Sequence, residues 1–366
     1  MKFRSERDVL VEALSAATRA VSTRAVGATT GLHLLVKGNE LTVTGTDLDL
    51  TVRAVIEVIG IDDGESVVPA RLVSDAVRHL EPGAVTIDSA DEKVEISAAR
   101  SRFSLRTFPA ADFPTLPASG SRSTSVPAGE FVDALRQVVR ASSSDDARPL
   151  LTGVLFTNEE GTLRLVATDS YRLALCDLPG RAAIAGDRDL IVPSRALNEL
   201  QRICGALAPD AEVGVALSDT EVTFLAGDTT ISSRLIEGAY PDHRQLIPAS
   251  YPNRLHLGKE TVLAALRRAR LLVRDNTTSV RMTMHSGGVD LKVVSHDVGD
   301  VEESVDGDFV GEELTIAFNP TYLIDGVDAV PGDEVVVETS DSARPAMVHG
   351  ADHGTFRYLL MPVRVQ

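Results

Sequence analysis

Three stretches of the chain begin with the same pattern of hydrophobic and polar residues. In each, a short alternating run leads into a segment whose apolar residues recur three and four positions apart, as Leu10, Ala13, Leu14 and Ala17 do. Alternation is typical of a half-buried strand, and the longer period is typical of an amphipathic helix. The pattern therefore predicts a strand followed by a helix in residues 2–14, 125–135 and 255–266.

A second pattern occurs once in each third of the chain, again with an apolar run that leads into a helical period. It covers residues 67–73, 191–197 and, more loosely, 315–321. Pro69 and Pro193 lie roughly 120 positions apart, which is a domain-sized period and too long for a solenoid repeat. Ser194 and Asn319 are candidate N-caps for the second and third of these helices.

Alternating runs interrupted by turn residues fill the rest of each third. Residues 32–44 and 154–166 predict hairpins, and 280–294 predicts another that turns at Ser286-Gly287-Gly288. Each third then holds two helices and roughly eight strands, and helices on one face of antiparallel sheets make an α+β fold. We expect three similar domains, with boundaries in small-residue and proline-containing stretches, at residues 1–121, 122–250 and 251–366.

Composition and termini narrow the setting. The first residues, Met1 to Asp8, are charged where a secretory signal would be apolar, and no apolar run is long enough to span a membrane. We therefore expect a soluble cytoplasmic protein. Cys176 and Cys204 are the only cysteines, and we expect both to be buried thiols in a reducing compartment.

The sequence contains no recognisable catalytic, metal or cofactor motif. It has no nucleophile elbow, no His-Glu-x-x-His pair, no phosphate-binding glycine loop and no Cys-x-x-Cys. The acidic pairs Asp47 with Asp49 and Asp145 with Asp146 are typical of solvated surface rather than of a metal site. We expect neither enzymatic activity nor a bound metal or cofactor.

Four stretches resemble the bacterial DNA polymerase III β subunit family, the β sliding clamps. They are residues 100–114, 167–174, 237–242 and 358–364, and the resemblance continues in order along the whole chain. It implies three clamp domains per chain and a head-to-tail homodimer that closes a ring around double-stranded DNA without reading its sequence. It also implies a processivity factor that recruits the replicative polymerase, the clamp loader and repair proteins through a short peptide motif with a Gln and bulky apolar anchors.

The resemblance assigns three sets of residues to surfaces. The partner-peptide pocket would comprise Leu151, Thr168, Tyr171, Arg172, Leu173, Pro241, Leu246, Met361, Pro362, Val363 and Arg364. The dimer interface would use Phe103, Leu105, Leu271 and Leu272. The arginines expected to face DNA are Arg24, Arg78, Arg136, Arg140, Arg195, Arg202, Arg267, Arg268, Arg270 and Arg274.

The net charge of −17 argues against DNA binding unless the charges are segregated. The predicted helical segments carry a slight positive charge in total, so the acidic excess lies in the rest of the chain. These segments are residues 6–24, 71–80, 130–140, 194–202, 259–274 and 320–330. Weakly basic helices would suit a ring that slides along DNA, since each tight phosphate contact would hold it in place.

Departures from the family pattern leave two alternatives open. Ser170-Tyr171 stands where the family usually has Gly-His, and Asp145, Pro149 and Leu150 stand where related clamps have Gln and a pair of Tyr. A specialised clamp paralogue for repair or inhibitor tolerance would fit these changes. A hydrolase with a dispersed catalytic triad is the other alternative, and the missing motifs disfavour it.

Overall fold

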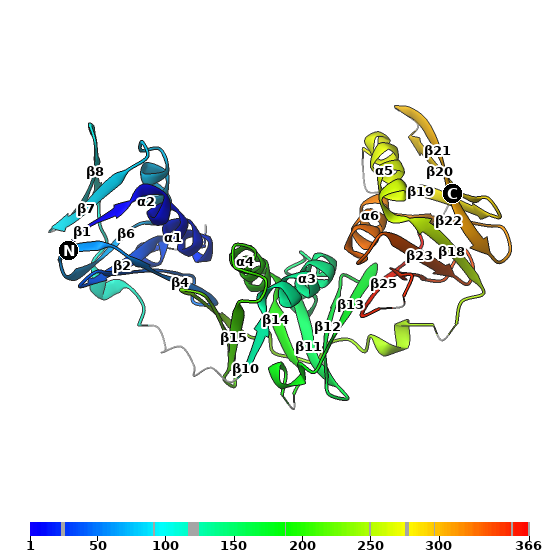
Figure 1. Cartoon of the computed structure of the whole chain (residues 1–366), viewed down its shortest axis with the longest axis horizontal. Helices are drawn as coiled ribbons and strands as arrows, with labels where there is room; N and C mark the ends of the chain where they lie inside the picture. Colours follow the sequence, from blue (N-terminus) through cyan, green and yellow to red (C-terminus); the bar gives the residue numbers. More distant parts are fainter. Residues whose placement is uncertain are drawn as a thin grey trace. The chain divides into compact units, whose positions relative to one another are not determined.

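The computed structural model describes residues 1–22, 26–90, 92–115, 124–186, 188–248, 250–274, 278–295, 297–352 and 354–364 (Figure 1). The chain forms two compact units, one of Met1–Val132 with Arg195–Leu235 and the other of Asp133–Ser194 with Ile236–Gln366. The middle third of the sequence therefore contributes to both units.

Two helices fall in each third of the chain, as the apolar periods predict. They are α1 Arg7–Ala20, α2 Ala70–Arg78, α3 Ala128–Val138, α4 Ser194–Cys204, α5 Lys259–Ala269 and α6 Pro320–Ala329. The Asn319 side chain accepts hydrogen bonds from the backbone N–H groups of Thr321 and Tyr322, so its predicted role as N-cap of α6 is confirmed. Ser194 is the first residue of α4 itself.

Helices α1 and α5 end earlier than their apolar patterns suggest. The predicted helix at 6–24 stops at Ala20, and the one at 259–274 gives way to a 3-10 turn, Arg270–Leu272. The chain continues in extended backbone at Val21 after α1 and at Val273 after the 3-10 turn. Valine is β-branched and favours extended backbone. The apolar period records only that a residue is hydrophobic, so it could not show that the helix ends before these valines.

The first unit holds two antiparallel sheets. A five-stranded sheet has the order β5-β1-β7-β8-β9, and an eight-stranded sheet has the order β10-β15-β16-β17-β4-β3-β2-β6. The strands are β1 Lys2–Glu6, β2 Gly31–Lys37, β3 Glu40–Thr46, β4 Leu50–Glu57, β5 Ile59–Asp62, β6 Gly64–Pro69, β7 Ala84–Ala90, β8 Lys93–Ala98, β9 Ser101–Arg106, β10 Thr124–Pro127, β15 Glu212–Leu217, β16 Glu221–Ala226 and β17 Thr229–Arg234. Because β17 pairs with β4, one sheet continues from the first third of the chain into the second.

The second unit holds a twelve-stranded antiparallel sheet with the order β14-β11-β12-β13-β25-β24-β23-β18-β21-β20-β19-β22. Its strands are β11 Gly153–Glu159, β12 Thr162–Thr168, β13 Arg172–Pro179, β14 Leu190–Pro193, β18 Asn253–Gly258, β19 Val280–His285, β20 Gly288–Ser295, β21 Gly299–Val310, β22 Leu314–Phe318, β23 Glu334–Thr339, β24 Ala346–Gly350 and β25 Phe356–Leu360. Here β13 pairs with β25, so the second and third parts of the chain also share a sheet. We call the β4–β17 pairing the first junction and the β13–β25 pairing the second junction.

Helices pack on the sheets through aliphatic side chains, and glycine permits the closest approaches. Helix α1 buries Leu10, Leu14 and Ala17 against β3 and β4. A Cβ on Gly45 would lie 2.0 Å from the Ala17 carbonyl oxygen, so only glycine allows this contact. The antiparallel sheets, covered by helices, match the predicted α+β class.

Both cysteines are buried, Cys176 in β13 and Cys204 in α4, and they form no disulfide. The expectation of two buried thiols is confirmed. Among the described residues, no helix is long and apolar enough to cross a membrane.

Candidate functional site

A tight turn between β12 and β13 presents the centre of the predicted peptide pocket. The Asp169 carboxylate accepts hydrogen bonds from the backbone N–H groups of Tyr171 at 2.9 Å and Arg172 at 3.0 Å. The Thr168 hydroxyl donates to the Arg172 carbonyl oxygen at 2.6 Å, and Ser170 takes a φ of +81°. These bonds hold the turn in one conformation, in which Tyr171 is 60% exposed.

Beneath this turn lies a buried apolar floor. Leu173 is only 3% exposed and packs in a cluster with Leu155 and Leu359, against which Tyr240 and Ile247 also pack. Leu151 is buried as well, in the 3-10 turn Pro149–Thr152. Leu151 and Leu173 can offer a partner only the edge of this floor, because little of either side chain reaches solvent.

Tyr240 supports the site, although it is not among the residues predicted for the pocket. Its hydroxyl oxygen accepts a hydrogen bond from the Thr168 backbone N–H at 3.1 Å, and burial raises the pKa of Tyr240 above its usual value. This bond ties the segment containing Pro241 to the pocket turn. The aromatic ring followed by Pro, within the stretch that resembles the family, is the signal that could have identified it.

The C-terminal segment forms a further side of the site. The Met361 N–H donates to the Tyr171 carbonyl oxygen at 2.9 Å, and the Val363 N–H donates to Ala317 at 2.8 Å. Met361 is 41% exposed and Leu246, in the 3-10 turn Arg244–Leu246, is 50% exposed. The structure thus brings Tyr171, Arg172, Leu173 and Met361 together where β13 begins and the paired strand β25 ends. The remaining predicted pocket residues vary in accessibility: Pro241 and Arg364 are exposed, and Pro362 and Val363 are half-buried.

The guanidinium of Arg172 holds together the polar residues of the predicted pocket. It contacts the carboxylates of Asp169 at 3.1 Å and Asp325 at 2.5 Å, donates to the Arg140 carbonyl oxygen, and lies over the ring of Tyr322. An arginine can satisfy several acceptors at once because its donors are fixed in a plane. Tyr322 and Asp325 lie on α6, far along the chain, and no local pattern could have linked them to Arg172.

The predicted DNA-facing arginines lie on the helices or in the turns that follow them, except Arg24, which lies outside the described residues. Most are already paired with carboxylates of the same chain. These paired residues are Arg78, Arg136, Arg140, Arg195, Arg202, Arg267 and Arg268. Arg270 and Arg274 are exposed, and neither has an ion-pair partner among the described residues.

The four predicted interface residues lie in two places. Phe103 and Leu105 are in β9, the edge strand of the five-stranded sheet, where Phe103 is 38% exposed and Leu105 packs against the core. Leu271 and Leu272 lie in the turn after α5, and Leu271 is 78% exposed. A large aliphatic side chain exposed to this degree is typical of a contact surface.

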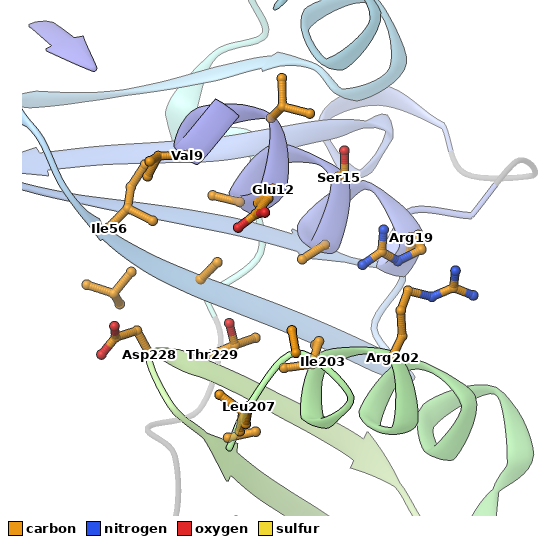
Figure 2. Close-up of a pocket in the computed structure, with 17 residues that line it drawn as sticks. Val9, Glu12, Ser15, Arg19, Ile56, Arg202, Ile203, Leu207, Asp228 and Thr229 are labelled. Atoms are coloured by element: carbon orange, nitrogen blue, oxygen red, sulfur yellow. The ribbon is translucent and has the colours of Figure 1, made fainter. Parts of the chain in front are cut away.

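A groove of about 570 Å³ runs along α1 at the first junction (Figure 2). Val9, Ile56 and Leu207 give it an apolar lining, and Arg19 and Arg202 lie near each other at one end. Arg19 is held by Glu199 at 2.6 Å. The groove thus combines apolar side chains with charged residues of both signs, and it includes none of the predicted pocket residues.

Comparison with known proteins identifies the family. Three family models described as the N-terminal, central and C-terminal domains of the DNA polymerase III beta subunit match residues 1–117, 125–242 and 244–364. Proteins named beta sliding clamp from Synechocystis and Pseudomonas aeruginosa are each 31% identical, with complete coverage of both chains.

Solved structures agree with the sequence relatives. The sliding clamp of Bartonella birtlesii bound to griselimycin matches with a TM-score of 0.92 and 28% identity, and that of Bacillus subtilis with 0.89 and 29%. Both comparisons cover all of each chain. The predicted resemblance and the three-domain α+β fold are therefore confirmed, and the chain belongs to the DNA polymerase III beta subunit family, the bacterial β sliding clamps.

Proposed function

We propose that this chain is a DNA sliding clamp, a non-enzymatic processivity factor that encircles duplex DNA and recruits the replicative polymerase, the clamp loader and repair proteins in the cytoplasm. Full-length membership of the β clamp family carries the proposal. The segments matched by the three family models support domains at 1–121, 122–250 and 251–366.

The two junctions suggest how a ring would close. Each joins successive thirds of the chain by pairing a strand that precedes the second helix of one third with the last strand of the next, β4 with β17 and β13 with β25. The corresponding strands that remain are β9, at the end of its sheet, and β21, whose residues 299–306 pair only with β20 among the described strands. We propose that β9 of one copy pairs with this part of β21 of a second copy.

The internal repeat supplies a register for this pairing. At the first junction Ile231 of β17 pairs with Val52 of β4. Phe103 is the residue of the first repeat that corresponds to Ile231, since each pairs with the fourth residue of the strand before it. Val301 is the residue of the third repeat that corresponds to Val52 by the same comparison of strand pairs. The expected partner of Phe103 is therefore Val301 of the second copy.

The helix ends support the same closure. At the first junction Arg19 at the end of α1 pairs with Glu199 of α4, and at the second Arg140 after α3 pairs with Asp328 of α6. The third repeat has Leu271 at the corresponding position after α5. An exposed apolar residue in place of an internal ion pair is suited to a contact between two chains, where burying it contributes free energy on assembly.

The state of the arginines is consistent with sliding. Internal carboxylates offset much of the positive charge on the helices, so a passing phosphate would gain little over the existing partner. Arg270 and Arg274 have no such partner among the described residues and are the strongest candidates for phosphate contact. Weak contacts at many positions would retain mobility, and encirclement would supply retention.

Retention on circular DNA tests the proposed function. Clamp loaded onto nicked circular duplex should remain bound for far longer than on linear duplex, because it can leave a circle only by opening. The measurement is the amount of clamp that co-elutes with DNA in gel filtration before and after the circle is cut. Equal loss from circles and from linear molecules would reject encirclement.

A peptide experiment tests the pocket separately. Burying one Leu or Phe anchor contributes roughly 1.5–3 kcal/mol, so two anchors suffice for micromolar affinity after ordering costs. Removing residues 361–366 takes away Met361 and the segment that bonds to Tyr171, and should abolish calorimetric binding of a peptide with a Gln and two apolar anchors. Arg136→Ala, on α3, is the matched control and should bind normally. Unchanged affinity after truncation would reject this pocket.

A further inference from the structure

The first junction contains a turn with the same conformation as the pocket turn at the second junction. Leu48 and Ser170 occupy corresponding positions and have φ values of +79° and +81°, which L-residues rarely adopt. The hydroxyl of Thr46 donates to the carbonyl oxygen four residues on at 3.2 Å, as the hydroxyl of Thr168 does at 2.6 Å. The repeat therefore preserves this turn in detail.

The surrounding backbone also corresponds. Asp47 accepts two backbone N–H bonds within its turn, as Asp169 does. The N–H of Arg234, the last residue of β17, donates to the Asp49 carbonyl oxygen at 2.9 Å, and the N–H of Met361, directly after β25, donates to the Tyr171 carbonyl oxygen at 2.9 Å. Corresponding backbone thus presents Asp49 and Arg234 at the first junction where the second presents Tyr171 and Met361.

The side chains at corresponding positions of the two junctions differ in polarity. Where the second junction has Leu151, Tyr171, Leu173 and Met361, the first has Thr29, Asp49, Thr51 and Arg234. Asp49 and Arg234 form an ion pair at 3.8 Å, and both side chains are largely exposed. An exposed ion pair of this kind adds little to the free energy of unfolding, so its presence is not explained by a contribution to folding stability.

We propose that the Asp49–Arg234 pair closes the first junction to apolar peptide motifs, and that Tyr171 and Met361 at the same backbone positions select the second junction. The inference rests on the proposed peptide pocket and adds which residues decide at which of the two junctions a peptide binds. It explains how a chain with a repeated turn would offer a single partner site.

The physical basis is the cost of removing water from charges. A Leu or Phe anchor laid on Asp49 and Arg234 would displace their hydration and provide no hydrogen bonds in return. The same anchor laid on Tyr171 and Met361 buries apolar surface against an aromatic ring and an adaptable thioether. Selectivity then arises as much from rejection at one junction as from attraction at the other.

Exchanging the two pairs of side chains tests the inference in the full-length protein. The probe is a peptide with a Gln, two apolar anchors and a photoreactive group, and cross-linked sites are mapped by mass spectrometry. The unaltered protein should be labelled at the second junction alone; no labelling there would reject the proposed pocket itself. Tyr171→Asp with Met361→Arg should weaken calorimetric binding roughly 10- to 100-fold. Thermal melting checks that this variant remains folded.

The decisive variant is Asp49→Tyr with Arg234→Met, which should introduce labelling at the first junction and a second binding event in calorimetry. Its matched control is Asp49→Asn with Arg234→Gln, which adds no apolar surface and keeps polar groups that an apolar anchor would strip of water, so the first junction should stay unlabelled. Suppose that Asp49→Tyr with Arg234→Met is still labelled at the second junction but not at the first. The Asp49–Arg234 pair would then not determine which junction binds the peptide. Binding within about threefold of the unaltered protein after Tyr171→Asp with Met361→Arg would overturn the inference equally.

Discussion

The guanidinium of Arg172 lies over the aromatic ring of Tyr322, with 4.3 Å between its Cζ atom and the ring centroid. The Tyr322 ring stacks in turn on that of Tyr171, at 6.5 Å between centroids. Arg172 therefore connects an exposed aromatic residue of the proposed pocket to helix α6, where it also binds Asp325. We therefore expect the shape of the proposed pocket to depend on this side chain.

Replacing Arg172 with Ala should destabilise the second junction by about 3 kcal/mol, because Asp169 and Asp325 would lose a largely buried partner. Arg172→Lys should recover only part of this, since an ammonium cannot reproduce the planar set of donors. Urea unfolding gives the free-energy differences. Arg136→Ala, which removes an exposed pair with Asp133 at 3.6 Å, serves as reference and should cost less than about 1 kcal/mol. Equal effects of Arg172→Ala and Arg136→Ala would contradict this role.

Local features of the site were predictable from the sequence, and contacts between distant residues were not. The apolar periods predicted the helices, and Asn319 was recognisable as a cap because capping depends on residues two and three positions away. The pairing of Arg172 with Asp325 joins residues 153 positions apart, and no spacing pattern encodes it. The ion pairs of the arginines predicted to face DNA could not be foreseen for the same reason, since charge counts do not show which carboxylate lies nearby.

A pH dependence is expected from His243, which is buried within the segment that holds Pro241 and Leu246. Burial lowers the pKa of His243, and the neighbouring guanidiniums of Arg244 and Arg164 lower it further, against smaller opposite effects of Glu159 and Asp242. The folded state therefore favours neutral His243. Its contribution to stability is complete above the unfolded pKa of about 6.5 and is lost as the pH falls from there through the folded pKa.

Calorimetric melting between pH 7.5 and 5 measures this effect. The melting temperature should fall below about pH 6.5, and the fall should be smaller in His243→Gln, which cannot gain the proton. His33→Gln is the comparison variant, because His33 is partly accessible and bonds to Glu65 at 2.9 Å in the other compact unit. Identical pH profiles for the unaltered protein and His243→Gln would remove His243 as the cause.

DNA contact should depend more on Arg270 and Arg274 than on the arginines with internal partners. Arg270→Gln with Arg274→Gln should lower the slope of log affinity against log salt by up to about 2 for linear duplex, if both reach phosphates. Arg267→Gln should change the slope less, because Arg267 already lies 3.3 Å from Asp328. Fluorescence anisotropy at several salt concentrations provides the slopes. A larger effect from Arg267→Gln than from the double variant would reverse this ranking.

The proposed dimer depends on apolar surface at Leu271 and Leu272. Replacing both with Ala should remove about 3–6 kcal/mol from each interface and yield monomer in sedimentation at micromolar concentration. Ile61→Ala is a suitable control, since Ile61 is also exposed but lies on β5, at the opposite edge of the sheet from β9. An unaltered protein that sediments as a monomer under these conditions would reject the proposal.

Cross-linking tests the register of that dimer. If Phe103 pairs with Val301 of a second copy, Phe103→Cys combined with Val301→Cys places two thiols on one face of adjacent strands, at a Cα separation of about 4.5–5.5 Å that a disulfide can span. Oxidation should then give a covalent dimer on a non-reducing gel. Phe103→Cys with Asp300→Cys is the control and should link poorly, because neighbouring residues point to opposite faces of a strand. The native thiols should interfere little, because Cys176 and Cys204 are both buried. Burial also raises the pKa of Cys204 to about 11, so little of its thiol ionises near neutral pH. Linkage through Asp300→Cys in preference to Val301→Cys would shift the register by one residue and place Asp300 instead of Val301 beside Phe103.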